Sequence, residues 1–242
     1  MIDTREARGS ASEVKFVVSQ AVGEQVRAWA RQHLEADPHG TGPFGDEYRT
    51  TTLYFDTLDR DVFHRRGSNG RAKYRIRRYD DYDFAFVERK LRRPGLLIKR
   101  RTQVPLNTLG ALRQTAGPWP GHWFARRVSA RGLVPTCQLV YRRTPRSIET
   151  SLGSARLTVD AGLAVAPASD VAFGALPPVP VLEGHAIVEI KFRGPTPGIF
   201  KRLVEEFNLA PQATSKYRLG IEAMTGVAIT AVQEELEPAI GG

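Results

Sequence analysis

The chain has 242 residues, of which 41% are hydrophobic and 25% charged, with 22 Gly and 16 Pro, a composition that excludes disordered, collagen-like and low-complexity proteins. The single cysteine, Cys137, excludes an intrachain disulfide framework and a cysteine-rich zinc site, and no apolar run approaches the roughly 20 residues that span a bilayer. The 35 Lys and Arg residues outnumber the 26 Asp and Glu residues, which favours a polyanionic partner: nucleic acid, an anionic membrane surface or a phosphate-rich small molecule.

The first half of the chain predicts strands and one long helix. Residues 1–11 are polar and we expect them to be flexible; they hold no apolar signal segment, so a reducing, cytoplasmic location is expected. Glu13–Val18 alternates charged with apolar residues and predicts a strand, after which Ser19 is a suitable N-cap for a helix to about Leu34. Four further segments have the composition or periodicity of strands: Tyr48–Phe55, Arg71–Tyr79, Asp83–Leu91 and Leu96–Pro105.

In the middle of the chain, residues 107–131 predict two helical pieces that break at 117–121, and the Pro-rich residues 167–184 predict a surface loop. Three more strands are predicted at Gln138–Thr144, Ala155–Asp160 and Ala186–Arg193.

Two helices are predicted near the C-terminus. Thr196 and Pro197 are a suitable N-cap and first-turn pair for the first helix, and the second begins near Ser215. Since no repeat and no linker divides the chain, we expect one domain over residues 12–225 and a C-terminal tail over 226–242.

Charged and apolar residues alternate along the predicted strands. Lys73, Arg75 and Arg77 share one face of their strand, with Tyr74 and Ile76 on the other. The charged faces of the other strands carry Glu13 and Lys15; Glu88, Lys90 and Arg92; Lys99 and Arg101; Arg156, Thr158 and Asp160; Glu189, Lys191 and Arg193. For any one strand, an antiparallel sheet with one solvated face is a sufficient explanation.

The number of charges favours a different arrangement. Between Arg60 and Arg101 there are 15 Lys and Arg against five Asp and Glu, and a flat exposed sheet with such rows of arginine would repel itself. Closing the sheet into a barrel places the charged faces inside and leaves the apolar faces for helices and loops to cover. We therefore predict an α+β fold, an antiparallel β-barrel with flanking helices.

Uncompensated positive charge in a confined space is costly, so such an interior is expected to bind an anion. Arginine forks and lysines bind phosphate oxygens. The interleaved carboxylates of Glu13, Glu88 and Glu189 offset part of the charge and offer hard oxygen ligands to Mg²⁺ or Mn²⁺. The pattern predicts a site for a metal–triphosphate complex, which holds the phosphate tail of a nucleotide rather than its base.

Other chemistries have less support. The five histidines show no ligand spacing and no P-loop motif occurs. The aromatic side chains are not aligned with the basic faces as in a single-strand binder, so no specific nucleic-acid partner is expected.

Eight short segments, in this order along the chain, carry a further signal: EVKF at 13–16, TTLYFDT at 51–57, KYRIRRY at 73–79, FVERK at 86–90, YRRTP at 141–145, RLTVD at 156–160, VEIKF at 188–192 and SKYRLG at 215–220. Together they resemble the VTC domain, the polyphosphate-polymerase domain of the vacuolar transporter chaperone complex, found also as stand-alone bacterial proteins. That family belongs with the triphosphate tunnel metalloenzymes. The resemblance implies an eight-stranded antiparallel tunnel.

The resemblance also implies roles for individual residues. Basic phosphate-binding positions of the family are matched by Lys15, Arg75, Arg77, Lys90, Lys99, Arg142, Arg156 and Lys191. Glu189 matches the metal-binding glutamate, although an ion pair with a neighbouring cation is its alternative role, and Ser215 and Lys216 match the Ser-Lys pair that closes around the phosphate chain. For Ser215 a plain helix N-cap is an alternative. Ala213 departs from the family, which has a further lysine there.

We expect a clamp on the triphosphate made by Arg75, Arg77, Lys90, Arg142 and Arg156. Further phosphate contacts are expected from Lys15, Lys73, Lys99, Arg101, Lys191, Ser215 and Lys216, and metal contacts from Glu189, Glu13 and Glu88. The family activity is transfer of the ATP γ-phosphoryl group to a growing polyphosphate chain with Mn²⁺. The expected partners are ATP, triphosphate and polyphosphate. The residues themselves leave two alternatives open: hydrolysis of an inorganic or nucleoside triphosphate, and polyphosphate binding without catalysis.

Overall fold

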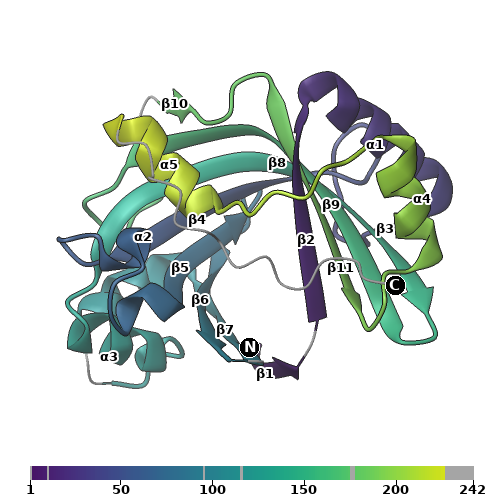
Figure 1. The fold of residues 1–242 in the computed structure, drawn as a ribbon. Coiled ribbons are helices and arrows are strands. Elements are labelled where there is room, and N and C mark those ends of the chain that lie inside the picture. Colours follow the sequence, from purple (N-terminus) through teal and green to yellow (C-terminus); the bar gives the residue numbers. More distant parts are fainter. Residues whose placement is uncertain (1, 10, 95, 115–116, 175–177, 227–242) are drawn as a thin grey trace.

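One strongly curved antiparallel sheet dominates the structure, a computed structural model that describes residues 2–9, 11–94, 96–114, 117–174 and 178–226 (Figure 1). The strands are β1 Asp3–Gly9, β2 Ala11–Ser19, β3 Glu35–Ala36, β4 Tyr48–Asp56, β5 Ala72–Tyr79, β6 Phe84–Arg93, β7 Leu96–Pro105, β8 Val134–Thr150, β9 Gly153–Pro167, β10 Val179–Pro180 and β11 His185–Arg193. The helices are α1 Gln20–His33, α2 Asp61–His64, α3 His122–Ala130, α4 Gly198–Glu206 and α5 Lys216–Thr225, with the 3-10 segments η1 Asn69–Arg71 and η2 Leu106–Arg113.

The predicted α+β class is confirmed, but the sheet is not a closed eight-stranded barrel. Its 11 strands follow the order β1-β7-β6-β5-β4-β8-β9-β11-β2, with β3 paired to β8 and β10 paired to β9. The two edges of this path are β1 and β2, which are consecutive in the chain and pair with different partners, β7 and β11. In the described residues the two edges of the sheet are therefore not paired with each other, although β1 and β2 follow one another in the chain.

Residues 3–9, which we expected to belong to a flexible N-terminus, form strand β1. It pairs with β7 from Asp3 opposite Thr102 to Gly9 opposite Leu96, and the Asp3 carboxylate accepts hydrogen bonds from Arg100 and Thr102. The cause is non-local, because β7 would otherwise present an unpaired edge. The predicted tail over 226–242 lies outside the described residues from 227 onward.

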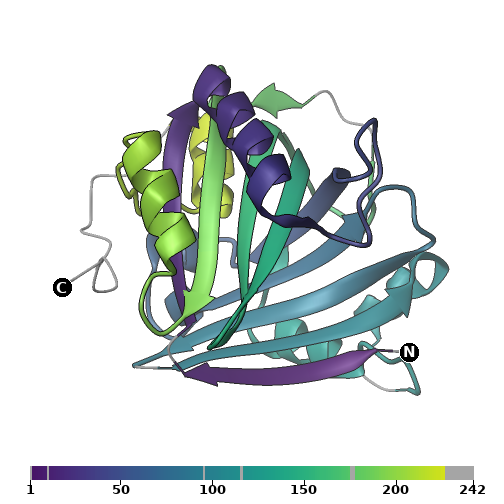
Figure 2. The ribbon, with the colours of Figure 1, turned by 90° about the vertical axis from the view of Figure 1, so that its right-hand side faces the viewer.

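The curvature brings distant strands face to face (Figure 2). Although β6 and β2 are six places apart in the strand order, Lys90 Nζ of β6 lies 3.1 Å from Glu13 Oε2 of β2. We call the concave side, to which these two side chains belong, the inner face, and the opposite side the outer face. The charged residues of the alternating strands lie mainly on the inner face, and the apolar residues between them lie on the outer face.

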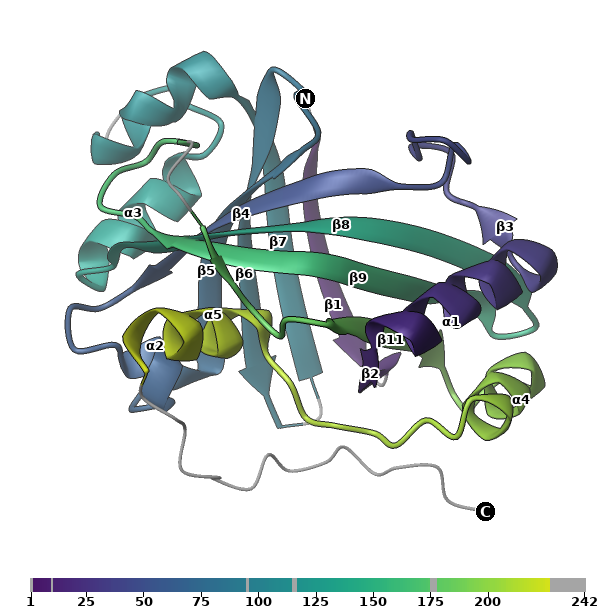
Figure 3. The ribbon, with the colours of Figure 1, turned by 90° about the horizontal axis from the view of Figure 1, so that it is seen from above.

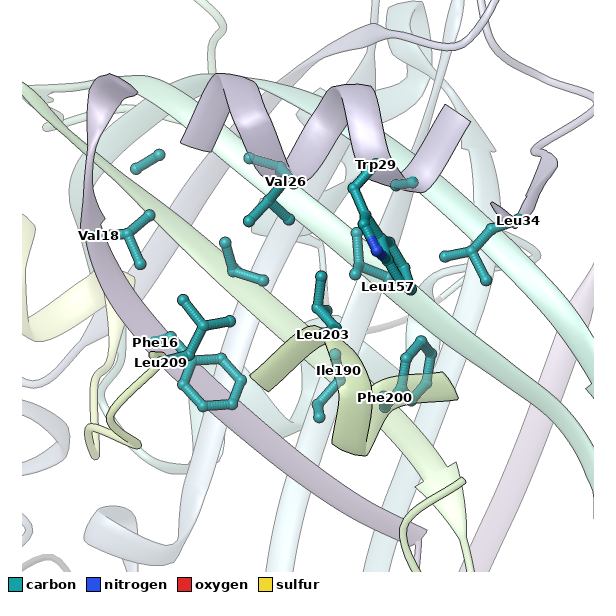
Figure 4. Packing of buried hydrophobic residues seen from close by; sticks show 14 of the residues in the cluster. Phe16, Val18, Val26, Trp29, Leu34, Leu157, Ile190, Phe200, Leu203 and Leu209 are labelled. Carbon is teal, nitrogen blue, oxygen red and sulfur yellow. The ribbon is translucent and has the colours of Figure 1, made fainter. Parts of the chain in front are cut away.

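Helices cover the apolar outer face in two places. One core packs Val26 and Trp29 of α1 and Phe200 of α4 against Phe16 and Leu157 of the sheet (Figures 3 and 4). A second core packs Phe124 and other residues of α3, together with η2, against the outer side chains of β4 to β7: Leu53, Phe55, Ala72, Tyr74, Ile76, Ala85, Val87 and Val104. Burial of this apolar surface is the main stabilising contribution to the fold.

Helix α5 packs on the inner face and makes a third core there. Tyr217 and Ile221 of α5 pack with Leu139, Val165 and other side chains of β8 and β9. Gly220 allows the close approach, since a Cβ at this position would lie 3.1 Å from Leu139 Cδ1. Part of the inner face is therefore apolar and covered, and the charged part lies beside it.

Most predicted elements are present with shifted ends. Ser19 caps α1 as expected, with its Oγ accepting from the Val22 amide. Strands β8 and β9 are longer than predicted, the 167–184 loop contains β10, and Pro197 rather than Thr196 precedes α4. Among the described residues, no helix is both long enough and apolar enough to cross a membrane.

Candidate functional site

Glu88 is the centre of the basic cluster formed by β5, β6 and β7. The strand register places Arg75 opposite Glu88 and Glu88 opposite Arg101. Glu88 Oε2 lies 2.6 Å from Arg75 Nε, and Oε1 lies 3.1 Å from Arg101 Nε and 3.8 Å from Lys99 Nζ. Burial disfavours the charged carboxylate, but Arg75, Arg77, Lys99 and Arg101 hold the pKa of Glu88 well below its usual value.

Arg77 lies next to this cluster on the same face. The residue is 5% exposed, and its guanidinium donates from Nε to Thr52 Oγ1 at 3.1 Å. Four predicted phosphate-binding residues (Arg75, Arg77, Lys99 and Arg101) therefore gather around one carboxylate, and positive charge is in excess.

A second cluster lies on β2, β6 and β11. Lys15 Nζ donates to Glu13 Oε1 and lies 4.0 Å from Glu189 Oε2, and Lys90 Nζ lies 3.1 Å from Glu13 Oε2. Burial opposes ionisation of Glu13, but Lys90 and Lys15 hold its pKa well below its usual value. Lys191 stands opposite Glu13 in the strand register and adds to this effect. The structure thus brings together five of the predicted residues.

Lys73 has no carboxylate within ion-pairing distance among the described residues. Its Nζ donates to Ser215 Oγ at 2.8 Å, just before α5. Burial, and then the positive charges of Lys90 and Lys15, lowers the pKa of Lys73 to about 7. The Ser215 side chain makes no capping hydrogen bond to α5, so its partner is Lys73 and not the helix.

The third cluster is centred on Asp160, which the alternation placed on the charged face but which was not assigned to the site. The Asp160 carboxylate is fully buried and accepts two hydrogen bonds from Arg143, both at 2.7 Å, and lies 2.7 Å from Lys216 Nζ. Burial would raise the pKa of Asp160, but Arg143 and Lys216 hold it well below its usual value.

The expectation that Arg142 lines the site is wrong. Its side chain is 70% exposed on the outer face and pairs with Glu47, whereas the neighbouring Arg143 is 14% exposed and faces inward. The register explains this, because paired residues of neighbouring strands point to the same face of the sheet. Arg143 pairs with the buried Tyr48, whereas Arg142 pairs with the exposed Arg49. The sequence YRRTP offers two adjacent arginines, and Arg143 shares its face with the apolar Leu139 and Tyr141, so alternation alone would not have selected it.

Arg156 lies at the rim of the inner face. Its Nη2 donates to Asp37 Oδ2 at 3.0 Å and to the Tyr48 hydroxyl at 3.2 Å, and its side chain is 41% exposed. It is far less buried than Arg77, so a ligand would meet it from the solvent side.

The three predicted metal ligands do not form one cluster. Among the described residues no three Asp, Glu, His or Cys side chains are grouped as a metal site. Glu13 and Glu189 do meet, since each has an oxygen within 4.0 Å of Lys15 Nζ. Glu88 is in a separate cluster, and both of its oxygens are engaged by cations.

Aromatic side chains also line the inner face, contrary to the expectation that they are not aligned with the basic residues. Arg101 Cζ lies 3.4 Å from the centre of the Phe86 ring, and Arg101 Nη2 donates to the Tyr79 hydroxyl at 3.0 Å. The positions were visible in the sequence, where Phe86 has the parity of Glu88 and Tyr79 that of Arg77.

Solved structures with similar folds were found, although no curated protein sequence matches the chain. A protein from Bacillus halodurans described as a candidate adenylate cyclase aligns with a TM-score of 0.52 and 16% identity, over 86% of this chain and 95% of that one. A candidate adenylyl cyclase from Hippeastrum, described as having a dominant triphosphatase activity, aligns at 0.49 and 14% identity, over 91% and 98% of the two chains. The PH1819 protein from Pyrococcus horikoshii OT3 aligns at 0.48 and 12% identity, over 88% and 98%.

At such identities the likeness shows the fold alone, a curved antiparallel sheet with flanking helices. The family is shown by the sequence. The profile of the VTC domain matches residues 10–225, which include all the inner-face clusters described above. The chain belongs to the VTC domain family.

Proposed function

We propose that the protein transfers the γ-phosphoryl group of ATP to the end of a polyphosphate chain on its inner face. The observation that supports this most directly is Lys73. Its ammonium group lies near other cations, and within the described part of the chain its hydrogen-bond partner is the neutral hydroxyl of Ser215. An anion with several negative charges would compensate this group, and a triphosphate or polyphosphate supplies them.

Two of the clusters supply cations for binding phosphate groups. Arg75, Arg77 and Arg101 present guanidinium groups that can bind phosphate oxygens in pairs. Lys15 and Lys90 add charge from the facing strands. In phosphoryl transfer most of the rate enhancement comes from positioning and charge stabilisation, so a rigid set of cations suffices for the protein's part.

The reaction is a displacement at the γ-phosphorus. An oxygen of the terminal phosphate of the acceptor attacks it, the bond to the β–γ bridging oxygen breaks, and ADP leaves with that oxygen. The cations hold donor and acceptor phosphates together against their mutual repulsion and stabilise the charge that develops on the leaving oxygen.

Glu13 and Glu189 are the residues that fit a divalent ion, Mn²⁺ or Mg²⁺. They are hard oxygen ligands, and their oxygens already flank a positive charge, the Lys15 ammonium. Such an ion, held by these two carboxylates, would neutralise part of the phosphate charge. Glu88 is less suited, because among the described residues its ion-pair partners are the cations Arg75, Arg101 and Lys99 and no second carboxylate shares its cluster.

Hydrolysis of a triphosphate is the second candidate, and the open sheet favours it. The side chains of Lys90 and Lys99 are 29% and 37% exposed, so water has access to the inner face. Water would then replace the polyphosphate end as the nucleophile. The reducing, cytoplasmic location inferred from the sequence belongs to the same proposal.

The test is incubation with γ-labelled ATP and Mn²⁺, followed by separation of the labelled products. Labelled long-chain polyphosphate supports the transferase, labelled free phosphate the triphosphatase, and neither product with retained binding of polyphosphate a binding protein. Glu189→Gln should abolish turnover, while Glu205→Gln, at an exposed position of α4, should not change it. Full activity of Glu189→Gln would refute the metal assignment.

A further inference from the structure

A row of aromatic rings continues the inner face where β5 ends and β6 begins. It consists of Tyr79, Tyr82, Phe84 and Phe86, which we call the aromatic row. The rings of Tyr82 and Phe84 are stacked, with centroids 5.1 Å apart and planes 8° apart. Phe84 meets Phe86 edge to face at 5.6 Å, and Phe86 contacts Tyr79 at 5.9 Å.

The aromatic row begins at the basic cluster and ends in solvent. At its inner end Arg101 lies over Phe86 and donates to Tyr79. At its outer end Tyr82 is 41% exposed, while Phe86 is 8% exposed. None of the three apolar cores formed by the described residues includes these four rings, so packing alone does not account for an exposed stacked pair next to a cluster of cations.

The spacing along β6 suits a nucleotide. Phe84, Phe86 and Glu88 point to the same face at successive alternate positions. Phe84 is four residues from Glu88, a distance of about 13 Å along the strand. This is comparable to the span of a triphosphate with its ribose, so terminal phosphates held beside Glu88 by Arg75 and Lys99 would leave the base beside Phe84 and Tyr82.

We propose that the aromatic row is the platform on which the base of the triphosphate donor stacks, so that nucleoside triphosphates bind more tightly than inorganic triphosphate. This rests on the proposed function, since it requires a triphosphate on the inner face. The base would stack on the Tyr82–Phe84 pair. Arg101 lies over Phe86 and beside Glu88, between the base and the terminal phosphates, and would bind the phosphate next to the ribose. Since stacking tolerates every base, we expect the larger purines to bind more tightly than pyrimidines, without discrimination between adenine and guanine.

The experiment compares two ligands that differ only in having a nucleoside. Binding of the β,γ-imido analogue of ATP and of inorganic tripolyphosphate is measured by calorimetry for the wild type and for the double variant Tyr82→Ala/Phe84→Leu. We expect the Kd of the ATP analogue to rise about tenfold, in the range of stacking losses at other sites, and the Kd of tripolyphosphate to stay the same. Retained tripolyphosphate binding also shows that the variant is folded.

Phe44→Ala is the matched control, because Phe44 is a 68% exposed aromatic that lies under Arg31, remote in sequence from the row. It should change neither Kd. An equal loss for both ligands, or no loss for either, would overturn the platform while leaving triphosphate binding in place. If the wild type binds neither ligand, the proposed function fails, and the platform fails with it.

Discussion

The Asp160 cluster (Asp160, Arg143 and Lys216) and the Lys73 cluster (Lys73 with Lys15, Lys90 and Ser215) differ in how their charges are balanced. Asp160 is fully buried and its two oxygens are bound by Arg143 and Lys216. Lys73 donates to a neutral serine while Lys90 and Lys15 add positive charge nearby. Both clusters contact the start of α5, through Lys216 and Ser215.

This difference separates structural charges from binding charges. A buried charge with its partners in place stabilises the arrangement of the chain, and removing one partner is strongly destabilising. A partly buried cation without a counter-ion costs free energy in the unliganded protein and regains it when an anion binds. We therefore assign the Asp160 cluster to holding α5 on the sheet and the Lys73 cluster to ligand binding.

The largest effect is expected from Asp160→Asn. The substitution leaves Arg143 and Lys216 buried without a carboxylate and should lower the free energy of unfolding by about 3–5 kcal/mol. Urea denaturation followed by circular dichroism measures it. Asp170→Asn is the control, since Asp170 pairs with Arg113 at the surface and its loss should leave the midpoint unchanged. Similar midpoints for both variants would contradict a structural role for Asp160.

The adjacent arginines of β8 give the next largest contrast. Arg143→Ala should lower the free energy of unfolding by about 2–3 kcal/mol, because Asp160 loses its bidentate partner and keeps only Lys216. Arg142→Ala removes an exposed side chain and should change stability by less than about 0.5 kcal/mol. Tripolyphosphate binding should be unchanged in Arg142→Ala. If Arg142→Ala weakens binding as much as substitution of Arg75 does, the inner and outer assignment in β8 is wrong.

The two arginines also show why the sequence predicted some of the site and not the rest. In β5, β6 and β11 charged residues recur on the inner face and apolar residues on the outer face, so parity alone located Arg75, Glu88 and Glu189. In β8 the inner residues Leu139 and Tyr141 are apolar, because α5 covers them. The pattern that identifies an inner face therefore changes within one strand, and it depends on a helix about 80 residues later in the chain.

The open sheet was missed for a similar reason. The strands predicted from local pattern are nearly all present, with the end shifts that hydrogen bonding at their edges produces. Strand β1 has no strong pattern of its own and forms because β7 offers an unpaired edge. Closure depends on such pairings between edges, which the alternation of residues does not specify.

A smaller effect, of opposite sign, is expected from Lys73→Met. Methionine has a similar length and no charge, so the unliganded variant should be more stable than the wild type by about 1–2 kcal/mol at pH 6. Its tripolyphosphate affinity should fall, because one cation is missing from the site. Denaturation with and without tripolyphosphate measures both changes, and a destabilised variant would contradict the excess of charge.

The difference in stability between Lys73→Met and the wild type should depend on pH. The pKa of Lys73 is about 7 in the folded protein and about 10.4 in an unfolded chain. Between these values the unfolded state binds more protons, so the contribution of Lys73 to the free energy of unfolding rises as the pH rises. The stability gained by Lys73→Met should therefore be largest below pH 7 and diminish toward pH 10. A gain that is constant with pH would show that Lys73 is not the group that titrates.

The smallest effects come from two serines that each precede a helix. Ser19 Oγ accepts from the Val22 amide and caps α1, so Ser19→Ala should cost about 1 kcal/mol of stability and leave anion binding unchanged.

Ser215 makes no such cap, and its Oγ accepts from Lys73. Ser215→Ala should therefore cost less stability than Ser19→Ala and lower the pKa of Lys73 further, because it removes a hydrogen-bond acceptor from the charged form. Tripolyphosphate titrations near pH 7 measure this, since a smaller fraction of Lys73 would be charged and binding would weaken more at pH 8 than at pH 6. An equal loss of binding at both pH values would show that Ser215 contacts the phosphate directly and does not act through Lys73.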